Sequence, residues 1–221
     1  MTHLHRALQE FYAGPDGELE ATVDGFRVDV LRGGTVHEIQ TGRFRAIHAK
    51  LAALAQQRPV VLVHPIAARK TLVKIEPASG EVLSERLSPK RGRLLDAFLE
   101  LPSLTDLLGQ PNLALEVVLT VERELRGPGP GSRRRRGVEV LDRRLTAIEQ
   151  RLRIDGPADL PRLLPVELPA EFTAPQLMGL LSVNLFLARK ITYTLARTGV
   201  VRALGRRGRG AVVYAAEMAG G

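Results

Sequence analysis

The chain has 221 residues, of which 44% are hydrophobic and 25% are charged, a composition typical of folded proteins and not of disordered ones. It contains no cysteine, which excludes disulfides, thiolate metal sites and a cysteine nucleophile. The amino terminus lacks the apolar core of a signal peptide, and no apolar run reaches the ~20 residues of a membrane span. We therefore expect a cytoplasmic protein without a membrane partner.

The formal net charge of +8 lies entirely in the second part of the chain. Residues 1–126 contain 16 Lys/Arg and 16 Asp/Glu, whereas residues 127–221 contain 16 Lys/Arg and 8 Asp/Glu. A basic excess confined to one part of a chain indicates a surface for a polyanion, most often a nucleic acid. Solubility alone is the other interpretation.

Residues 1–126 read as one mixed α/β domain, because apolar residues recur there with both helical and strand spacing. Leu4, Leu8 and Phe11 predict an opening helix that ends at the turn Gly14-Pro15-Asp16-Gly17. The later segments predict strands over 26–31, 36–41, 60–63 and 71–75 and helices over 44–55 and 93–101. Residues 113–121 favour a strand, with a helix as the alternative.

Residues 127–137 alternate Gly and Pro and then place Arg133, Arg134, Arg135 and Arg136 side by side. This composition predicts a basic linker, which is either a solvated tether or an arm that contacts phosphates. It separates the first domain from a second one at 138–221. There we expect a helix over 140–152, a helix over 174–181 with Thr173 as its N-cap, a helix over 185–198 ended by Gly199, and strands over 200–204 and 211–214.

The most informative segment is the predicted hairpin around Gly33-Gly34, since both glycines tolerate the positive φ of a two-residue turn. Residue numbers of partners across this turn sum to 67, so Asp29 faces Glu38 and Arg27 faces Gln40. Two opposed carboxylates with Cβ atoms ~5 Å apart are destabilising unless something compensates them. A divalent cation is the natural compensator. Neutralisation by Arg27, or plain exposure to solvent, are the alternatives.

The run Val28-Asp29-Val30-Leu31, followed after the turn by Glu38-Ile39-Gln40, resembles the active-site hairpin of the PD-(D/E)XK nuclease superfamily. The resemblance covers roughly residues 5–75 and rests on a short motif. It implies a restriction-endonuclease-like mixed sheet flanked by helices, and a Glu from the preceding helix, for which Glu10 is the candidate. It also implies that Asp29, Glu38 and the Ile39 carbonyl hold Mg²⁺ or Mn²⁺ for phosphodiester hydrolysis. Many such nucleases act as dimers, so a homodimer is possible.

The family places a lysine where this chain has Gln40. Glutamine can orient a water molecule by hydrogen bonding, but it carries no charge that would favour hydroxide. Certain branches, including competence-associated nuclease-like proteins, have a similar Glu-Ile-Gln triplet. Lys50, on the next predicted helix, could supply the ammonium group, or it could simply be exposed to solvent. If nothing replaces the lysine, the domain would bind metal or nucleic acid without cutting.

The order helix, turn, helix, strand, basic turn, strand at the carboxy-terminal end resembles a winged helix-turn-helix domain. The resemblance implies a helix in the major groove of DNA and a wing on the backbone. The residues then available to DNA are Arg189, Lys190, Thr192, Tyr193 and Arg197 on the helix, and Arg206, Arg207 and Arg209 in the wing. A winged helix that binds another protein is the alternative.

Together these features predict a Mg²⁺-dependent nuclease that acts on DNA and is targeted by a winged helix. A non-enzymatic DNA-binding regulator with a degenerate nuclease-fold domain is the alternative, because position 40 is Gln. RNA as the substrate also stays open, although an aromatic content of 4% makes recognition by base stacking less expected.

Overall fold

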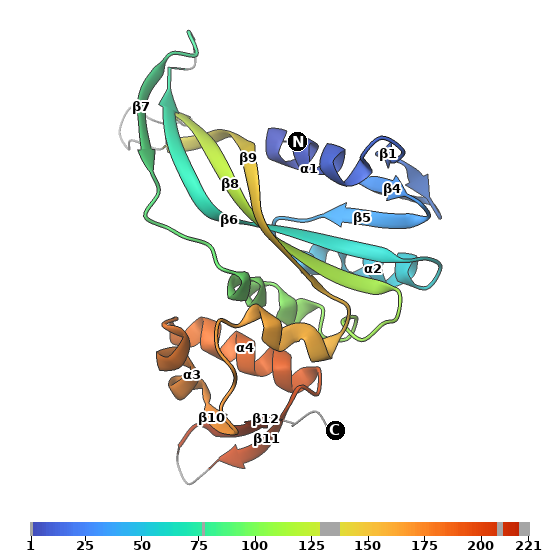
Figure 1. The fold of residues 1–221 in the computed structure, drawn as a ribbon, viewed down its shortest axis with the longest axis vertical. Helices are drawn as coiled ribbons and strands as arrows, with labels where there is room; N and C mark the ends of the chain where they lie inside the picture. The colour runs from blue at the N-terminus through green and yellow to red at the C-terminus, as the bar shows by residue number, and fades with distance from the viewer. Residues whose placement is uncertain (1, 77, 129–137, 207–209, 217–221) are drawn as a thin grey trace.

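The computed structural model describes residues 2–76, 78–128, 138–206 and 210–216 (Figure 1). In the first part of the chain the elements are α1 (His3–Ala13), β1 (Glu18–Leu19), β2 (Thr22–Val23), β3 (Phe26–Arg27), β4 (Val30–Arg32), β5 (Thr35–Ile39), the 3₁₀ helix η1 (Phe44–Ile47), α2 (His48–Ala55), β6 (Val60–Ile75) and β7 (Val82–Leu87). They continue with the 3₁₀ helices η2 (Leu94–Leu99) and η3 (Leu101–Ser103), β8 (Leu113–Pro128), β9 (Val138–Ile154), the 3₁₀ helix η4 (Pro157–Leu163), β10 (Glu171–Thr173), α3 (Ala174–Leu181), α4 (Leu185–Arg197), β11 (Val201–Arg206) and β12 (Val212–Ala216).

A twisted mixed sheet with helices on both faces organises the structure, so the protein has an α/β fold (Figure 1). The strand order is β1-β4-β5-β6-β8-β9, and β7 also pairs with β6. Strands β5, β6 and β8 are parallel, whereas the pairs β1/β4, β4/β5 and β8/β9 are antiparallel. Among the described residues, none of the helices combines the length and the apolar character needed to traverse a bilayer.

Two apolar clusters hold the helices on the sheet. On one face, Leu4 and Leu8 of α1 pack on Val61, Val63 and Val118 of β6 and β8. Phe11, which the helical spacing placed in the core, is 46% exposed, and its neighbour Tyr12 is buried in its place. The other face carries α2 and the 3₁₀ helices, within a larger cluster that continues into the carboxy-terminal elements.

Several strands are longer than the sequence pattern predicts. The two strands predicted over 60–63 and 71–75 are one strand, β6, and residues 113–121 form the first half of β8. The far ends of β6, β8 and β9, together with β7, project past the amino-terminal end of α1 (Figure 1). We call this projection the strand arm and define it as residues 69–75, 82–87, 120–128 and 138–147.

The helix predicted over 140–152 is wrong, because these residues belong to β9, which pairs antiparallel with β8. The ladder shifts register at three places, and each shift adds one residue to β9. Each extra residue reverses the alternation of side chains between the two faces of a strand. Apolar residues therefore recur at spacings of three and four, as on a helix, although the backbone is extended. The helix predicted over 93–101 is also replaced, by the two 3₁₀ helices η2 and η3.

The carboxy-terminal elements α3 and α4 pack beside a three-stranded sheet of order β10-β12-β11. Thr173 is the N-cap of α3, as predicted, and forms a capping box with Gln176. These elements share the large apolar cluster with η2: Phe172, Ile191 and Leu195 lie in the same buried set as Phe98. The predicted linker lies, beyond residue 128, outside the described residues, and the two strands on either side of it are neighbours in one sheet.

Candidate functional site

The hairpin of β4 and β5 has the predicted register. Val30 pairs with His37 and Leu31 with Val36, so the residue numbers sum to 67. Gly33 and Gly34 have φ values of +54° and +78°, which glycine adopts without the steric cost of a Cβ. The predicted strand over 26–31 is interrupted, however, because β3 ends before a bend at Val28 and Asp29 and belongs to a separate hairpin with β2.

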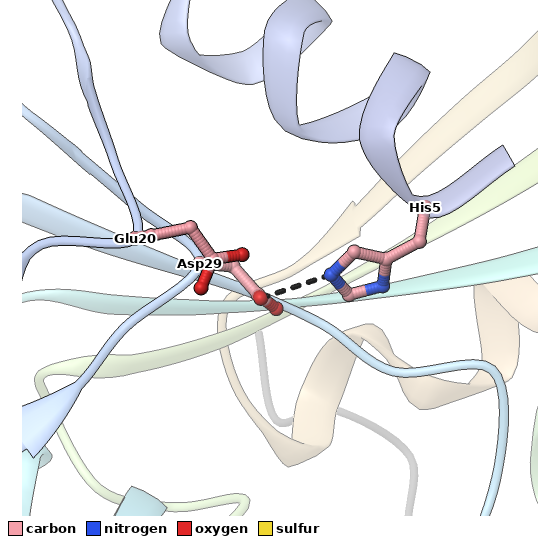
Figure 2. A group of neighbouring side chains, drawn as sticks. All are labelled: His5, Glu20 and Asp29. Atoms are coloured by element: carbon pink, nitrogen blue, oxygen red, sulfur yellow. Dashed lines mark hydrogen bonds and ion pairs between the residues drawn. The ribbon is translucent and has the colours of Figure 1, made fainter. Parts of the chain in front are cut away.

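The bend places Asp29 at the meeting point of three elements. Its backbone N–H donates to Glu38 Oε1 at 3.3 Å, so these two residues are neighbours as predicted. On its other side lies Glu20, whose N–H donates to the Asp29 carbonyl at 3.0 Å. His5 reaches the same point from α1, with Nε2 2.9 Å from Asp29 Oδ1 (Figure 2). Potential metal-ligating atoms of His5, Glu20 and Asp29 all lie within 4.8 Å of one another.

Gln9, one turn after His5 on α1, completes this cluster and is fully buried. Its amide Nε2 donates to Glu20 Oε1 at 2.5 Å and to Asp29 Oδ1 at 3.2 Å. Its Oε1 is buried and has no hydrogen-bond partner among the described residues. Leaving a buried carbonyl oxygen without a hydrogen bond costs free energy, about 1–3 kcal/mol for a typical group.

The hydrogen bonds of the cluster shift two pKa values in opposite directions. The hydrogen bond that His5 donates to Asp29 raises the pKa of His5, although burial opposes the shift. Burial alone would raise the pKa of Asp29, but hydrogen bonds from His5, from the Ile39 N–H at 2.7 Å and from Gln9 hold it below its usual value. The raised pKa of His5 and the lowered pKa of Asp29 both favour the charged pair when no ion is bound. Neutral imidazole is the form that ligates a metal, so an ion that binds to His5 would displace its proton.

Lys50 is brought to the hairpin by α2. Its Nζ lies 2.6 Å from Glu38 Oε1, and it also donates to the Arg27 carbonyl at 2.5 Å. Its side chain is only 22% exposed. Burial raises the pKa of Glu38, and the hydrogen bond from Lys50 limits that rise. The ammonium group of Lys50 thus lies beside the predicted carboxylate of Glu38, although it comes from a different element from the one that carries Gln40.

Three predicted positions differ in the structure. Glu10 points away from the cluster: it is exposed and paired with Arg6 at 2.8 Å, because the helix turns Gln9 inward in its place. The Gln40 amide donates to the Gly42 carbonyl at 2.5 Å. Arg27 does not face Gln40, since it lies on β3, and its Nε is 2.6 Å from Glu20 Oε2.

Sequence reasoning missed His5, Gln9 and Glu20. The spacing of four between His5 and Gln9, each directly after a buried leucine, was a signal that both lie near one face of the helix. Glu20 had no such signal, because its position opposite Asp29 depends on the pairing of the two-residue strand β1 with β4.

The packing of α4 leaves some of the predicted nucleic-acid-binding residues exposed and buries others. Arg189, Tyr193 and Arg197 are exposed, as is Arg206 at the end of β11. Arg189, Tyr193 and Arg206 line one groove between α4 and the strand pair β11/β12. Thr192 also lines this groove but is buried, and the Nζ of Lys190 donates to the Leu99 carbonyl. Arg133, Arg134, Arg135, Arg136, Arg207 and Arg209 lie outside the described residues.

The fold therefore defines an α/β protein with a cluster of carboxylates, imidazole and amide at the edge of a mixed sheet. The chain belongs to the family described as "Domain of unknown function (DUF8091)", which matches residues 2–155, from the N-cap of α1 to just beyond the end of β9. It is similar to a protein of Treponema pallidum (strain Nichols) described as "Uncharacterized protein", with 27% identity over 178 residues, 80% of this chain and 70% of the relative. No solved structure matches the chain.

Proposed function

We propose that the cluster around Asp29 is the centre of a divalent-metal-dependent nuclease that acts on DNA. The convergence of His5, Glu20 and Asp29, with ligating atoms within 4.8 Å of one another, is the observation that carries the proposal. Carboxylate oxygens are the ligands that Mg²⁺ and Mn²⁺ prefer, and an imidazole among them favours Mn²⁺.

The residues present fit such an ion. A half-turn rotation of the Gln9 side-chain amide would exchange the positions of Nε2 and the unpaired Oε1, so that Oε1 would face Glu20 and Asp29. That orientation is unfavourable beside two bare carboxylates, but it becomes favourable when a cation lies between them. Glu38 lies next to this position, through the hydrogen bond from the Asp29 N–H.

The side chains of the cluster and its neighbours would have different roles in the reaction. His5, Glu20 and Asp29 would hold the ion, and the Ile39 N–H fixes the orientation of the Asp29 carboxylate. When bound, the ion would polarise the scissile phosphate and lower the pKa of a coordinated water. Lys50, positioned by Glu38 and the Arg27 carbonyl, would stabilise the negative charge that develops on the phosphate. Gln40 cannot take this role, because its amide carries no charge.

DNA is the favoured substrate because of the carboxy-terminal elements. Their order, from η4 through β10, α3 and α4 to the pair β11/β12, resembles that of a winged helix in which η4 would be the first helix. Arg189, Arg197 and Arg206 are exposed there and suit contacts to phosphates.

The direct test is cleavage of single-stranded DNA, double-stranded DNA and RNA by the purified protein. We expect DNA cleavage with Mg²⁺ or Mn²⁺, with higher activity in Mn²⁺, complete loss with EDTA, and recovery when excess metal is added back. Binding without metal-dependent cleavage of any of the three substrates would contradict the proposal. It would favour the DNA-binding regulator, which the engagement of Gln40 with the Gly42 carbonyl also favours.

Lys50→Ala is expected to lower the cleavage rate by about 10²-fold or more, because it removes the charge at the reacting phosphate. Metal binding, measured by calorimetry with Mn²⁺, should stay within twofold of that of the native protein. Lys50→Arg retains the charge and should recover part of the rate. A circular dichroism spectrum and a thermal melt verify that each variant folds. An unchanged rate in a folded Lys50→Ala protein would remove Lys50 from the mechanism.

A further inference from the structure

We infer that the strand arm carries a second, phosphate-binding site, formed by Lys74, Arg86 and Arg126. The inference rests on the proposed function, because it assigns the bound phosphate to the backbone of the nucleic acid substrate. The site would bind a part of the substrate that is distant from the cluster at Asp29, and it would take no part in the chemistry.

The first observation is the pairing of charges between β6 and β8. Lys70 lies opposite Glu122, an attractive pair, whereas four residues further out Lys74 lies opposite Arg126. Like charges directly opposite one another across a sheet are destabilising. The far end of the arm therefore keeps a repulsive pair that an anion would relieve.

A third cation comes from β7. Ser84 lies opposite Lys74 and Arg86 lies opposite Leu72, so Ser84 and Arg86 share the face of Lys74. Together with Val138 of β9, these strands line an open pocket of about 130 Å³. The described residues that line it are three cations, one hydroxyl and two apolar side chains, with no acidic residue among them: Leu72, Lys74, Ser84, Arg86, Arg126 and Val138.

The nearby carboxylates do not neutralise this pocket. Buried Glu124 accepts from Arg126 at 2.7 Å and from Lys70 at 2.8 Å, and Arg143 lies 3.4 Å away. One carboxylate is thus shared by three cations. Lys74 and Arg86 have no ion pair with any other described residue, and both are exposed to solvent. The other carboxylate near this end of β9, that of Asp142, is paired with His3 and Arg144.

The pocket lies on the same face of the sheet as α1. Glu38, the neighbour of Asp29, pairs with Leu62 of β6, which pairs with Leu115 of β8, and Arg126 is eleven residues further along β8. Eleven residues correspond to about 36 Å at ~3.3 Å per residue, so a small anion at the pocket would not reach the cluster at Asp29. A nucleic acid would, because ~36 Å corresponds to about eleven base pairs at 3.4 Å each. The geometry therefore favours a phosphate of a polymer over a free phosphorylated metabolite.

The test uses the full chain in EDTA, so that it measures binding without cleavage. The variant is Lys74→Ser/Arg86→Ser, and the control is Lys90→Ser/Arg91→Ser, which removes one Lys and one Arg from an exposed segment outside the pocket. For a 20-base-pair duplex we expect the pocket variant to bind about tenfold more weakly, with a salt slope smaller by about 1, as for one lost phosphate contact. The control should match the native protein. A thermal melt should show no loss of stability in the pocket variant, since a repulsion is removed.

Ligand length separates the two sources of phosphate. A duplex of four base pairs spans about 14 Å and cannot reach from the cluster at Asp29 to the pocket, so the variant and the native protein should bind it equally. Two results would overturn the inference. One is equal affinity of the native protein and the pocket variant for the 20-base-pair duplex. The other is binding of inorganic phosphate by the native protein as tightly as the 20-base-pair duplex, with loss of that phosphate binding in the variant. If the native protein cleaves DNA and the pocket variant binds the duplex as tightly as the native protein, the phosphate site is refuted and the proposed function is not. If the variant binds more weakly but the native protein does not cleave, the proposed function is refuted and the phosphate site is not.

Discussion

Asp29→Asn is expected to lower metal-dependent DNA cleavage by at least about 10³-fold, equivalent to ~4 kcal/mol of transition-state stabilisation. The Asp29 carboxylate accepts hydrogen bonds from His5, Gln9 and the Ile39 N–H, and it is the common neighbour of Glu20 and Glu38. Asparagine preserves the size of the side chain and one acceptor oxygen, but it removes the negative charge that a divalent ion requires. DNA binding in EDTA should be unchanged, because the exposed arginines lie elsewhere.

Glu10→Gln is the matched control for this substitution, because it also replaces a carboxylate with its amide. Glu10 is exposed on α1 and paired with Arg6, so cleavage should stay within twofold of that of the native protein. Mn²⁺ titration by calorimetry gives the second measurement: the affinity should fall by well over tenfold for Asp29→Asn and remain unchanged for Glu10→Gln. Full activity in Asp29→Asn would exclude this cluster as the reaction centre.

Phe172→Ala is expected to destabilise the whole protein by about 3–5 kcal/mol, since it empties a fully packed site in the core. Phe172 is 2% exposed and belongs to one apolar cluster with Phe98 of η2 and Leu115 of the large sheet. Because this cluster is continuous, the carboxy-terminal elements and the sheet should unfold in a single transition, measured by urea titration with circular dichroism.

Phe186→Ala removes the same side chain from the surface of α4, where Phe186 is 62% exposed. Its effect on the free energy of unfolding should lie within about 0.5 kcal/mol, as for most surface substitutions. Two separate unfolding transitions in the native protein, of which Phe172→Ala shifts only one, would show that the carboxy-terminal elements unfold as an independent unit.

The sequence was sufficient where short-range chemistry decides the conformation. Gly33 and Gly34 specify a tight turn, and a tight turn sets the register of both flanking strands. Thr173 followed by Gln176 marks the start of a helix in the same local way. The neighbours Asp29 and Glu38, the capped helix α3 and the α/β class of the fold were therefore readable from residue types and spacing alone.

Only the tertiary structure decided which side chains surround Asp29 and where residues 138–154 belong. His5 and Gln9 on α1, Glu20 beside β1 and Lys50 on α2 come from three separate segments, and no local pattern encodes the distances between these segments. In β9 the local pattern was misleading, because three extra residues change the spacing of apolar residues along the strand to one that resembles a helix. Pairing with β8 nevertheless makes the segment a strand. The physical reason is the same in both cases. Contacts between distant segments depend on the packing of whole elements, whereas turns and caps depend only on the few residues that form them.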